Sequence, residues 1–239
     1  MKILAVDTSS TLASVSLLNG KEVLYTEDSN NITHSEKLLK LVDNIMTKEK
    51  LKIKDLDYLM VINGPGSFTG ARIGVVTIKG LAIPFDKKII ALTSLEAMAI
   101  NEYISLNTDE EKIICSLLDA KNSRAYYGIF KLEKINGKIK STILYNISND
   151  TFEDIKDKLY NFSNVLVISD IPEILKDEFD KEKFIIYSKK CSPNAAALIN
   201  FYKYAEKETL NNHITDCYLL DIIYARLSQA ERMKNEESK

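Results

Sequence analysis

The feature of this chain that most constrains its fold is an internal repeat. An apolar run that ends in aspartate occupies residues 1–7, and a second one, residues 113–119, follows 112 positions later. Six residues after each aspartate an alanine begins another apolar stretch, at residues 13–18 and 125–132. The offset is close to half of the 239 residues. We therefore expect a duplicated β-β-β-α-β-α unit, against the simpler alternative of a chance match.

The segments between these strands fit the same repeat. Asn19-Gly20 and Asn136-Gly137 are hairpin signals that lead into further strands at residues 22–25 and 139–146. Short apolar runs predict strands at residues 58–62, 89–92, 165–169 and 184–187. Helical periodicity and capping residues predict helices at residues 33–50, 67–83, from 93 onward, 151–159 and 193–207. We expect an α/β chain with two subdomains, residues 1–106 and 107–239, the last helix packing back on the first subdomain.

Composition excludes several classes of protein. The formal charge is −2, 45% of residues are hydrophobic and 28% are charged, as in ordinary globular proteins. The longest charge-free run, residues 58–71, is shorter than the roughly 20 residues that cross a bilayer. The start lacks the pattern of a signal peptide, and the three cysteines are far apart. We expect a cytoplasmic protein that does not contact the membrane.

Glycine is scarce and concentrated. The chain has 8 glycines, and five of them fall within residues 64–80. The segment follows a predicted strand and begins a predicted helix, which is where loops that bind phosphate occur. Its third glycine, Gly70, comes one residue too late for a dinucleotide loop, and Ala71-Arg72 replace the Lys-Ser/Thr pair of a P-loop. The spacing therefore does not favour a phosphate site.

The same glycines fit a helix face better. Gly66, Gly70 and Gly74 are four residues apart and therefore lie on one side of a helix. Glycine in a helix costs about 0.5–1 kcal/mol relative to alanine, so three on one face indicate a close approach by another backbone. We expect a second helix on this face, either from the same chain or from a partner subunit.

Metal and phosphate chemistry have weak support. The only histidines are His34 and His213, and a His-x-x-x-His pair that began at His34 would need histidine where Leu38 stands. We therefore expect no metal site. Asp7 and Asp119 could each orient a phosphate or a hydrated magnesium ion. The alternative, which we favour for Asp7, is an Asx-type turn closed by its side chain.

Several segments resemble the bacterial TsaB family, also called YeaZ-like. The matching segments are residues 3–9, residues 33–39, the Asn-Gly-Pro-Gly-Ser-Phe-Thr-Gly segment with its extension at residues 63–74, residues 93–97 and residues 224–232. The resemblance is strong over about the first 100 residues and weak through the second half. It implies the duplicated fold of the actin, sugar kinase and Hsp70 superfamily (ASKHA, RNase H-like), in which two halves face one cleft.

The resemblance also implies a function. TsaB proteins are dimerisation subunits of the complex that makes threonylcarbamoyladenosine beside the anticodon of tRNAs reading A-starting codons. They pair with the related catalytic subunit TsaD, whose metal is held by a His-x-x-x-His pair, and TsaE joins them. The chain is thus expected to be a non-catalytic scaffold that forms a homodimer when alone and meets tRNA only through the complex. The helices from residues 33 and 67 would form the partner surface: His34, Leu38, Leu41, Ile45, Gly66, Phe68, Thr69, Gly70, Arg72, Ile73 and Gly74.

Two alternatives concern nucleotides. The chain could be a nucleotide-dependent phosphotransferase or ATPase of the same superfamily, acting through Asp7 and Asp119. In the scaffold interpretation, Asp7, Thr8, Ser9 and Asp119 line a vestigial nucleotide cleft, and the chain holds no cofactor of its own. A third alternative is that ATP or ADP with Mg²⁺ binds only at the interface with TsaD.

Overall fold

The computed structural model describes residues 1–28, 34–179, 184–186 and 189–225. Its strands form two sheets. The first contains β1 (Lys2–Asp7), β2 (Ala13–Asn19), β3 (Glu22–Asp28), β4 (Tyr58–Ile62), β5 (Ile89–Leu92) and β11 (Ile214–Thr215). The second contains β6 (Lys112–Asp119), β7 (Arg124–Ile135), β8 (Lys138–Thr151), β9 (Leu166–Ser169) and β10 (Ile185–Ile186).

The order of the strands confirms the duplication. The first sheet runs β11-β5-β4-β1-β2-β3 and the second runs β10-β9-β6-β7-β8. Apart from β11, each strand of one sheet has its counterpart at the same place in the other. In both sheets an antiparallel three-stranded meander is extended by parallel strands, which helices connect.

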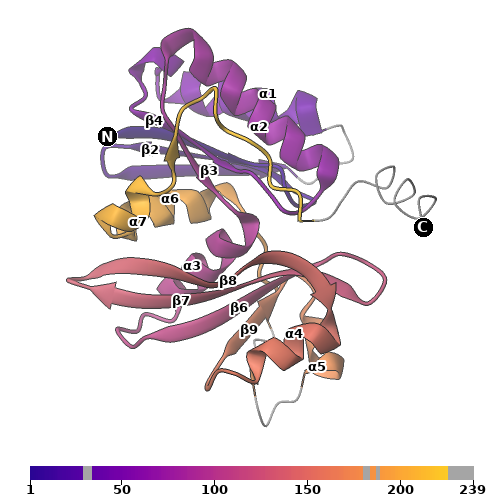
Figure 1. Cartoon of the computed structure of the whole chain (residues 1–239). Coiled ribbons are helices and arrows are strands. Elements are labelled where there is room, and N and C mark those ends of the chain that lie inside the picture. Colours follow the sequence, from indigo (N-terminus) through magenta and orange to yellow (C-terminus); the bar gives the residue numbers. More distant parts are fainter. Residues whose placement is uncertain (29–33, 180–183, 187–188, 226–239) are drawn as a thin grey trace.

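The helices complete five alternating layers (Figure 1). Helices α1 (His34–Lys48) and α2 (Phe68–Ala82) cover the outer face of the first sheet, and α4 (Phe152–Leu159) and α5 (Pro172–Glu178) cover the outer face of the second. Between the sheets lie α3 (Ser94–Ser105) and α6 (Ala195–Tyr204), followed by the short α7 (Lys207–Asn211). Apolar side chains from both sheets and both inner helices make one continuous core.

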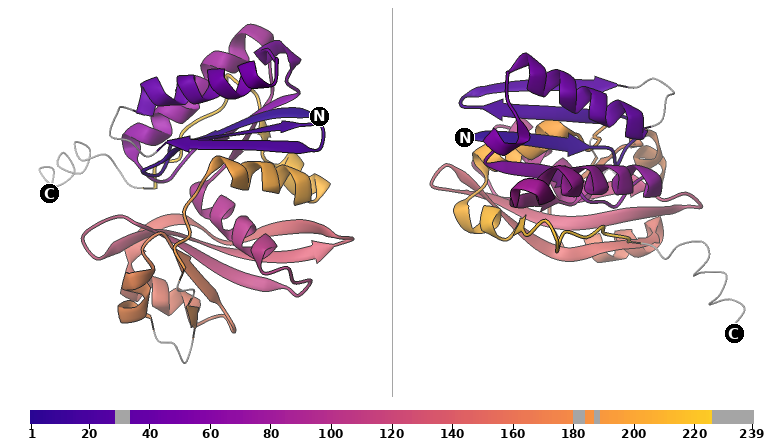
Figure 2. Two further views of the ribbon diagram at one scale, coloured as in Figure 1. Left: turned by 180° about the vertical axis from the view of Figure 1, so that it is seen from behind. Right: turned by 90° about the horizontal axis from the view of Figure 1, so that it is seen from above.

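The two inner helices are exchanged between the halves. Helix α3 follows the first sheet in sequence but packs on β6 and β7 of the second, while α6 packs on β1, β2 and β4 of the first (Figure 2). Polar contacts fix this exchange, because Ala195 donates its backbone N–H to Ser14 Oγ at 2.9 Å. Tyr103 of α3 and Phe201 of α6 are both fully buried. The two halves therefore share a core and are not independent.

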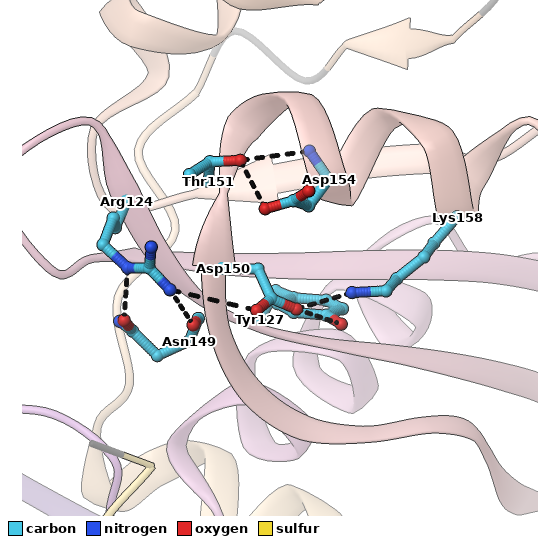
Figure 3. A network of polar contacts seen from close by, with 7 residues as sticks. All are labelled: Arg124, Tyr127, Asn149, Asp150, Thr151, Asp154 and Lys158. Atoms are coloured by element: carbon cyan, nitrogen blue, oxygen red, sulfur yellow. Dashed lines mark hydrogen bonds and ion pairs between the residues drawn. The ribbon is translucent and has the colours of Figure 1, made fainter. Parts of the chain in front are cut away.

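One ion pair recurs at equivalent places in the two halves. Asp28 pairs in register with Ala13, and Asp150 pairs in register with Ala125. Each aspartate receives a lysine from the first helix of its own half: Lys37 Nζ lies 3.7 Å from Asp28 Oδ1, and Lys158 Nζ lies 2.5 Å from Asp150 Oδ2. In the second half a larger network surrounds the aspartate, with Tyr127, Arg124 and Asn149 (Figure 3).

The end of the described chain returns to the first half. Residues 213–225, which we call the C-terminal strap, start at His213, form β11, which pairs with β5, and continue along α2. The strap is held by side chains of the first half that bond its backbone: Lys79 Nζ donates to Leu220 O at 2.9 Å, and Asn63 Nδ2 donates to Asp221 O at 3.0 Å. The expected boundary after residue 106 thus falls between α3 and β6, while the strap and α6 pack on the first sheet.

Some predicted boundaries differ from the observed ones. The helix expected at residues 193–207 is two helices, because Ala205 takes an extended conformation and Glu206 caps α7. The strand expected to end at residue 146 continues to Thr151. Thr33, the predicted cap of α1, and most of residues 224–232 lie outside the described residues.

Among the described helices, the stretch Phe68–Phe85 is long and apolar enough to cross a membrane by length and composition alone. It consists of α2 and the following turn, and α2 packs on β4 and β1. A core helix of a soluble protein passes the same test, so this is weak evidence for a span.

Candidate functional site

The glycine segment packs against the turn between β1 and β2. Ser67 caps α2 by accepting the N–H of Gly70 at 3.1 Å, and Gly66 comes before the helix. A Cβ on Gly70 would collide with the carbonyl oxygen of Thr8, and one on Gly74 would lie 2.7 Å from Thr8 Oγ1. A Cβ on Gly66 would collide with the Ser9 carbonyl oxygen in the same way. The close approach was predicted, but the approaching backbone is a turn of the same chain.

The expectation that a second helix packs on the glycine face is therefore wrong. Gly70 and Gly74 are buried under the β1–β2 turn and are not part of a partner surface. Leu38 and Ile45 are also buried, at 0% and 5% exposure, in the core between α1 and the first sheet. Leu41 and Ile73 are partly buried against the same cluster. His34 begins α1, but its side chain lies outside the described residues.

A different face of α2 is exposed. Phe68, Arg72 and Val76 follow one another at intervals of four and lie on one side of the helix, and Ile83 continues that side beyond its end. Phe68 is 45% exposed, Val76 64% and Ile83 41%. We call these four residues the α2 face. Val76 and Ile83 were not among the residues predicted from the sequence, because the glycine spacing indicates the opposite side of α2. Thr69 is exposed beside the α2 face.

The strap extends the α2 face. The Arg72 guanidinium stacks 3.7 Å above the centre of the Phe68 ring, and Arg72 Nε donates to Tyr224 OH at 2.8 Å. The rings of Phe68 and Tyr224 are 5.1 Å apart. Further along the strap, Tyr218 and Leu219 are 64% and 78% exposed. Aromatic and apolar side chains around an arginine are typical of the centre of a protein–protein interface.

A second site is the cleft between the halves. It has a volume of about 280 Å³ and is lined by Ser9, Ser10, Thr11, Gly66, Ser67, Leu118, Asp119, Asp170, Lys190, Ser192 and Pro193. Asp119 donates its backbone N–H to Asp170 Oδ1 at 3.2 Å. Burial and the nearby Asp119 carboxylate raise the pKa of Asp170. For Asp119 itself burial favours a higher pKa, but the bonds from Lys121 outweigh it and lower the pKa. Asp170 and Lys190 were not found from the sequence, because no motif marks them.

Asp7 does not belong to this cleft. Its side chain is fully buried, and its Oδ1 accepts the N–H of Ser9 at 2.8 Å, which is the Asx-type turn that we favoured. Its Oδ2 has no hydrogen-bond partner, and burial raises the pKa of the carboxyl to about 6. Thr8 is likewise buried and donates its hydroxyl to Gly70 O. Of the four residues expected to line a vestigial nucleotide cleft, only Ser9 and Asp119 do so.

His213 is the one histidine whose side chain the structure describes, and both of its ring nitrogens are bonded within the protein. His213 Nε2 lies 2.9 Å from Glu96 Oε2, and its Nδ1 lies 2.8 Å from the carbonyl oxygen of Thr209. In the described part of the chain, no group of three or more His, Cys, Asp or Glu side chains is arranged to hold a metal ion.

Comparison with known proteins places this geometry in context. The family model for TsaD, tRNA N6-adenosine threonylcarbamoyltransferase, matches residues 29–162, which is more than half of the chain. A tRNA threonylcarbamoyladenosine biosynthesis protein TsaB from Haemophilus influenzae is 30% identical over 135 residues, covering 56% of each chain. The TsaB protein of Bacillus subtilis is 32% identical over 146 residues, covering 60% of each chain. The matched regions thus span less than two thirds of these relatives.

Solved structures agree on the fold. A crystal structure from Pseudomonas aeruginosa, described as an uncharacterised protein with similarity to the peptidase YeaZ, superposes with a TM-score of 0.78. It covers 94% of this chain and 99% of its own, at 18% identity. At that identity the similarity establishes the arrangement of the two sheets and the helix layers.

Proposed function

Because this chain belongs to the TsaD family of tRNA N6-adenosine threonylcarbamoyltransferases, in which it is TsaB-like, we propose that it acts in tRNA threonylcarbamoyladenosine biosynthesis as a non-catalytic subunit. Its partner is a catalytic TsaD-like subunit, and a TsaE-like subunit joins the two. In the absence of that partner, a second copy of the chain occupies the same surface. Contact with tRNA is made by the assembled complex.

The observation that carries this proposal is the α2 face with the strap beside it. Burying a valine or phenylalanine side chain that is otherwise exposed is worth about 1.5–3 kcal/mol. Phe68 and Val76 lie on one side of α2 and Ile83 continues that side just beyond its end, so a partner helix can bury all three together. Leu39 of α1, 54% exposed, offers a further apolar contact on the outer helix layer.

The sequence supports the non-catalytic half of the proposal. The family resemblance assigns the metal of the catalytic subunit to a His-x-x-x-His pair. This chain has two histidines in all, at positions 34 and 213, so no segment of it can supply such a pair. His213 is moreover bonded on both ring nitrogens within the protein.

The proposal places ATP or ADP with Mg²⁺ at the interface between subunits, not in this chain alone. In the phosphotransferase alternative, Asp7 and Asp119 would have to face one nucleotide. Asp7 is fully buried and does not line the cleft that contains Asp119, which speaks against a shared role. Calorimetry with Mg-ATP separates the two: tight binding by the isolated chain would favour the phosphotransferase.

The test is reconstitution with the TsaD of the same organism. We expect the two proteins to purify together and tRNA threonylcarbamoylation to require both. Val76→Asp, which changes an exposed residue of the α2 face, should abolish co-purification while the circular dichroism and melting temperature stay unchanged. Ile185→Asp places the same charge on an apolar residue of similar exposure (55%) in the second half, and it should still bind.

Two results would contradict parts of this proposal. Undiminished binding by Val76→Asp would remove the α2 face from the interface. Full threonylcarbamoylation by TsaD without this chain would contradict the role of a required subunit.

A further inference from the structure

The strap is anchored by a buried cluster on three elements. Glu96 of α3 is 3% exposed, and its Oε1 accepts the hydroxyl of Ser141 from β8 at 2.8 Å. Its Oε2 faces His213 Nε2 at 2.9 Å. Thr209 of α7 is 5% exposed, and its carbonyl oxygen lies 2.8 Å from the other ring nitrogen of His213, Nδ1. His213 is the residue directly before β11, so this cluster fixes the point where the strap begins.

The hydrogen-bond chemistry of the cluster requires a shared proton. A backbone carbonyl only accepts hydrogen bonds, so His213 Nδ1 must carry a proton to bond Thr209 O. A carboxylate also only accepts, so Nε2 must carry a second proton to bond Glu96 Oε2. The bonded pair therefore holds one proton more than neutral His213 with ionised Glu96. When that proton leaves, two acceptors face each other at 2.9 Å in a buried place.

Besides each other, the side chains of Glu96 and His213 bond Ser141 and the carbonyl oxygen of Thr209, neither of which titrates. The other ionisable side chains of the adjoining cavity, about 450 Å³, are Lys140 of β8, Glu206, which caps α7, and Glu208 within α7. From α6, the ring of Phe201 contacts the imidazole edge to face, with ring centroids 4.9 Å apart. Strand β5, which pairs with β11, has no charged residue. Although burial lowers the pKa of His213, the bonds to Glu96 and Thr209 outweigh it and raise the pKa.

We propose that the Glu96–His213 pair is a proton-dependent lock at the start of the C-terminal strap, and that releasing it loosens the strap along the partner surface. The lock lies at the start of the strap, and the later anchors are separate contacts: Lys88 bonds Asp216, Lys79 bonds Leu220 O and Arg72 bonds Tyr224. The lock itself concerns the isolated chain, and only its effect on docking rests on the proposed function.

The direction of the pH effect follows from the difference in the pKa of His213 between the locked and the released strap. Histidine in an unfolded or released strap has a pKa near 6.5, and in the locked strap its pKa is higher. The lock is thus fully effective below pH 6.5 and weakens as pH rises through the higher, locked value. Between the two values the ratio of released to locked strap rises up to about tenfold per pH unit.

The experiment is hydrogen–deuterium exchange on the full-length chain at several pH values, corrected for intrinsic exchange with the amides of β6 as the internal reference. We expect protection of residues 214–224 to fall by up to about tenfold per pH unit between pH 6.5 and the raised pKa of locked His213, while protection of β9 stays constant. His213→Ala should lower the protection of the strap and remove its dependence on pH.

Glu96→Gln is the matched variant that separates the lock from simple packing. Glutamine has the same shape, and its amide can donate to neutral His213 Nε2 while its oxygen accepts from Ser141. We expect this variant to keep the strap protected and to lose the pH dependence. Strap protection that varies with pH identically in the wild type and Glu96→Gln, or that keeps its pH dependence in His213→Ala, would overturn the proposal.

Docking is tested separately. Wild-type affinity for the TsaD-like subunit should fall above pH 6.5, and that of Glu96→Gln should fall less. If exchange follows the expected pattern but affinity does not, the lock holds and its link to docking fails. If neither variant nor wild type binds the partner at any pH, the proposed function fails while the exchange result stands.

Discussion

The hydroxyl of Thr8 donates to the carbonyl oxygen of Gly70 at 2.7 Å, and this contact joins the β1–β2 turn to the first turn of α2. It brings two backbones so close that no side chain fits at position 70. The contact also sets the rotation of α2 about its axis. With the glycines facing inward, Phe68, Arg72 and Val76 face outward.

Gly70→Ala should destabilise the protein. The added Cβ would overlap a backbone carbonyl oxygen, which cannot rotate away, and overpacking of this kind costs about 1–3 kcal/mol or more. Gly80→Ala is the control, because Gly80 lies in the same helix with open space around a Cβ. It should stabilise by up to about 1 kcal/mol. Urea unfolding of both variants measures this, and equal stabilities would contradict the packing described here.

Asp7 should make the protein less stable at neutral than at mildly acidic pH. Its pKa is about 6 in the folded chain against an ordinary 3.8, so the folded state holds the proton more tightly than the unfolded state. Stability is therefore gained as pH falls from above 6 toward 4, by at most about 3 kcal/mol. Asp7→Asn should remove this dependence in urea titrations at pH 4.5 and 7.5.

Asp119 should make stability depend on pH with the opposite sign. Although burial alone would raise its pKa, the bonds from Lys121 lower it, so the stability that it contributes above its ordinary pKa is lost as pH falls. Asp119→Asn should therefore flatten the acid side of the stability profile. An acid side that is unchanged or steeper in Asp119→Asn would contradict this prediction.

The Asp150 network should be worth more than a surface ion pair. Asp150 accepts bonds from Tyr127 and Lys158 and has Arg124 nearby, and its side chain is 23% exposed (Figure 3). A double-mutant cycle of Asp150→Ala and Lys158→Ala should give a coupling of about 0.5–2 kcal/mol. The equivalent cycle of Asp28 and Lys37, at 3.7 Å, should give less. Urea unfolding supplies both values, and the reverse order would refute the comparison.

Gly64→Ala should displace the strap without disturbing the second half. Gly64 has a φ of +109°, and a Cβ there would lie 2.6 Å from the carbonyl oxygen of Ile223. Ile223 also donates its N–H to Asn63 O at 2.9 Å, so the strap and this loop are in direct contact. We expect faster proteolytic cleavage within residues 216–225 at unchanged pH. Cleavage at the wild-type rate would mean that the loop tolerates the extra atom.

Features set by residues close together in the sequence were predicted, whereas the partners in contacts between distant segments were not. Strands β1, β4 and β6, the cap Thr93 and the 112-residue repeat were predicted correctly, because periodicity and capping act between near neighbours. The close approach to Gly66, Gly70 and Gly74 was also predicted, since glycine inside a helix is costly. The approaching group was assigned wrongly, because the turn at Thr8 lies 62 residues from Gly70.

The sequence by itself determined the elements, the duplication and the family. Only the tertiary structure decided which side of α2 faces solvent, that Asp7 is buried away from Asp119, and that Glu96, Ser141 and His213 meet. These are outcomes of packing between segments up to 181 residues apart, as between Ser14 and Ala195. Local pattern carries no information about such pairs, because the energy that selects them arises only when the two sheets and the exchanged helices bury one common core.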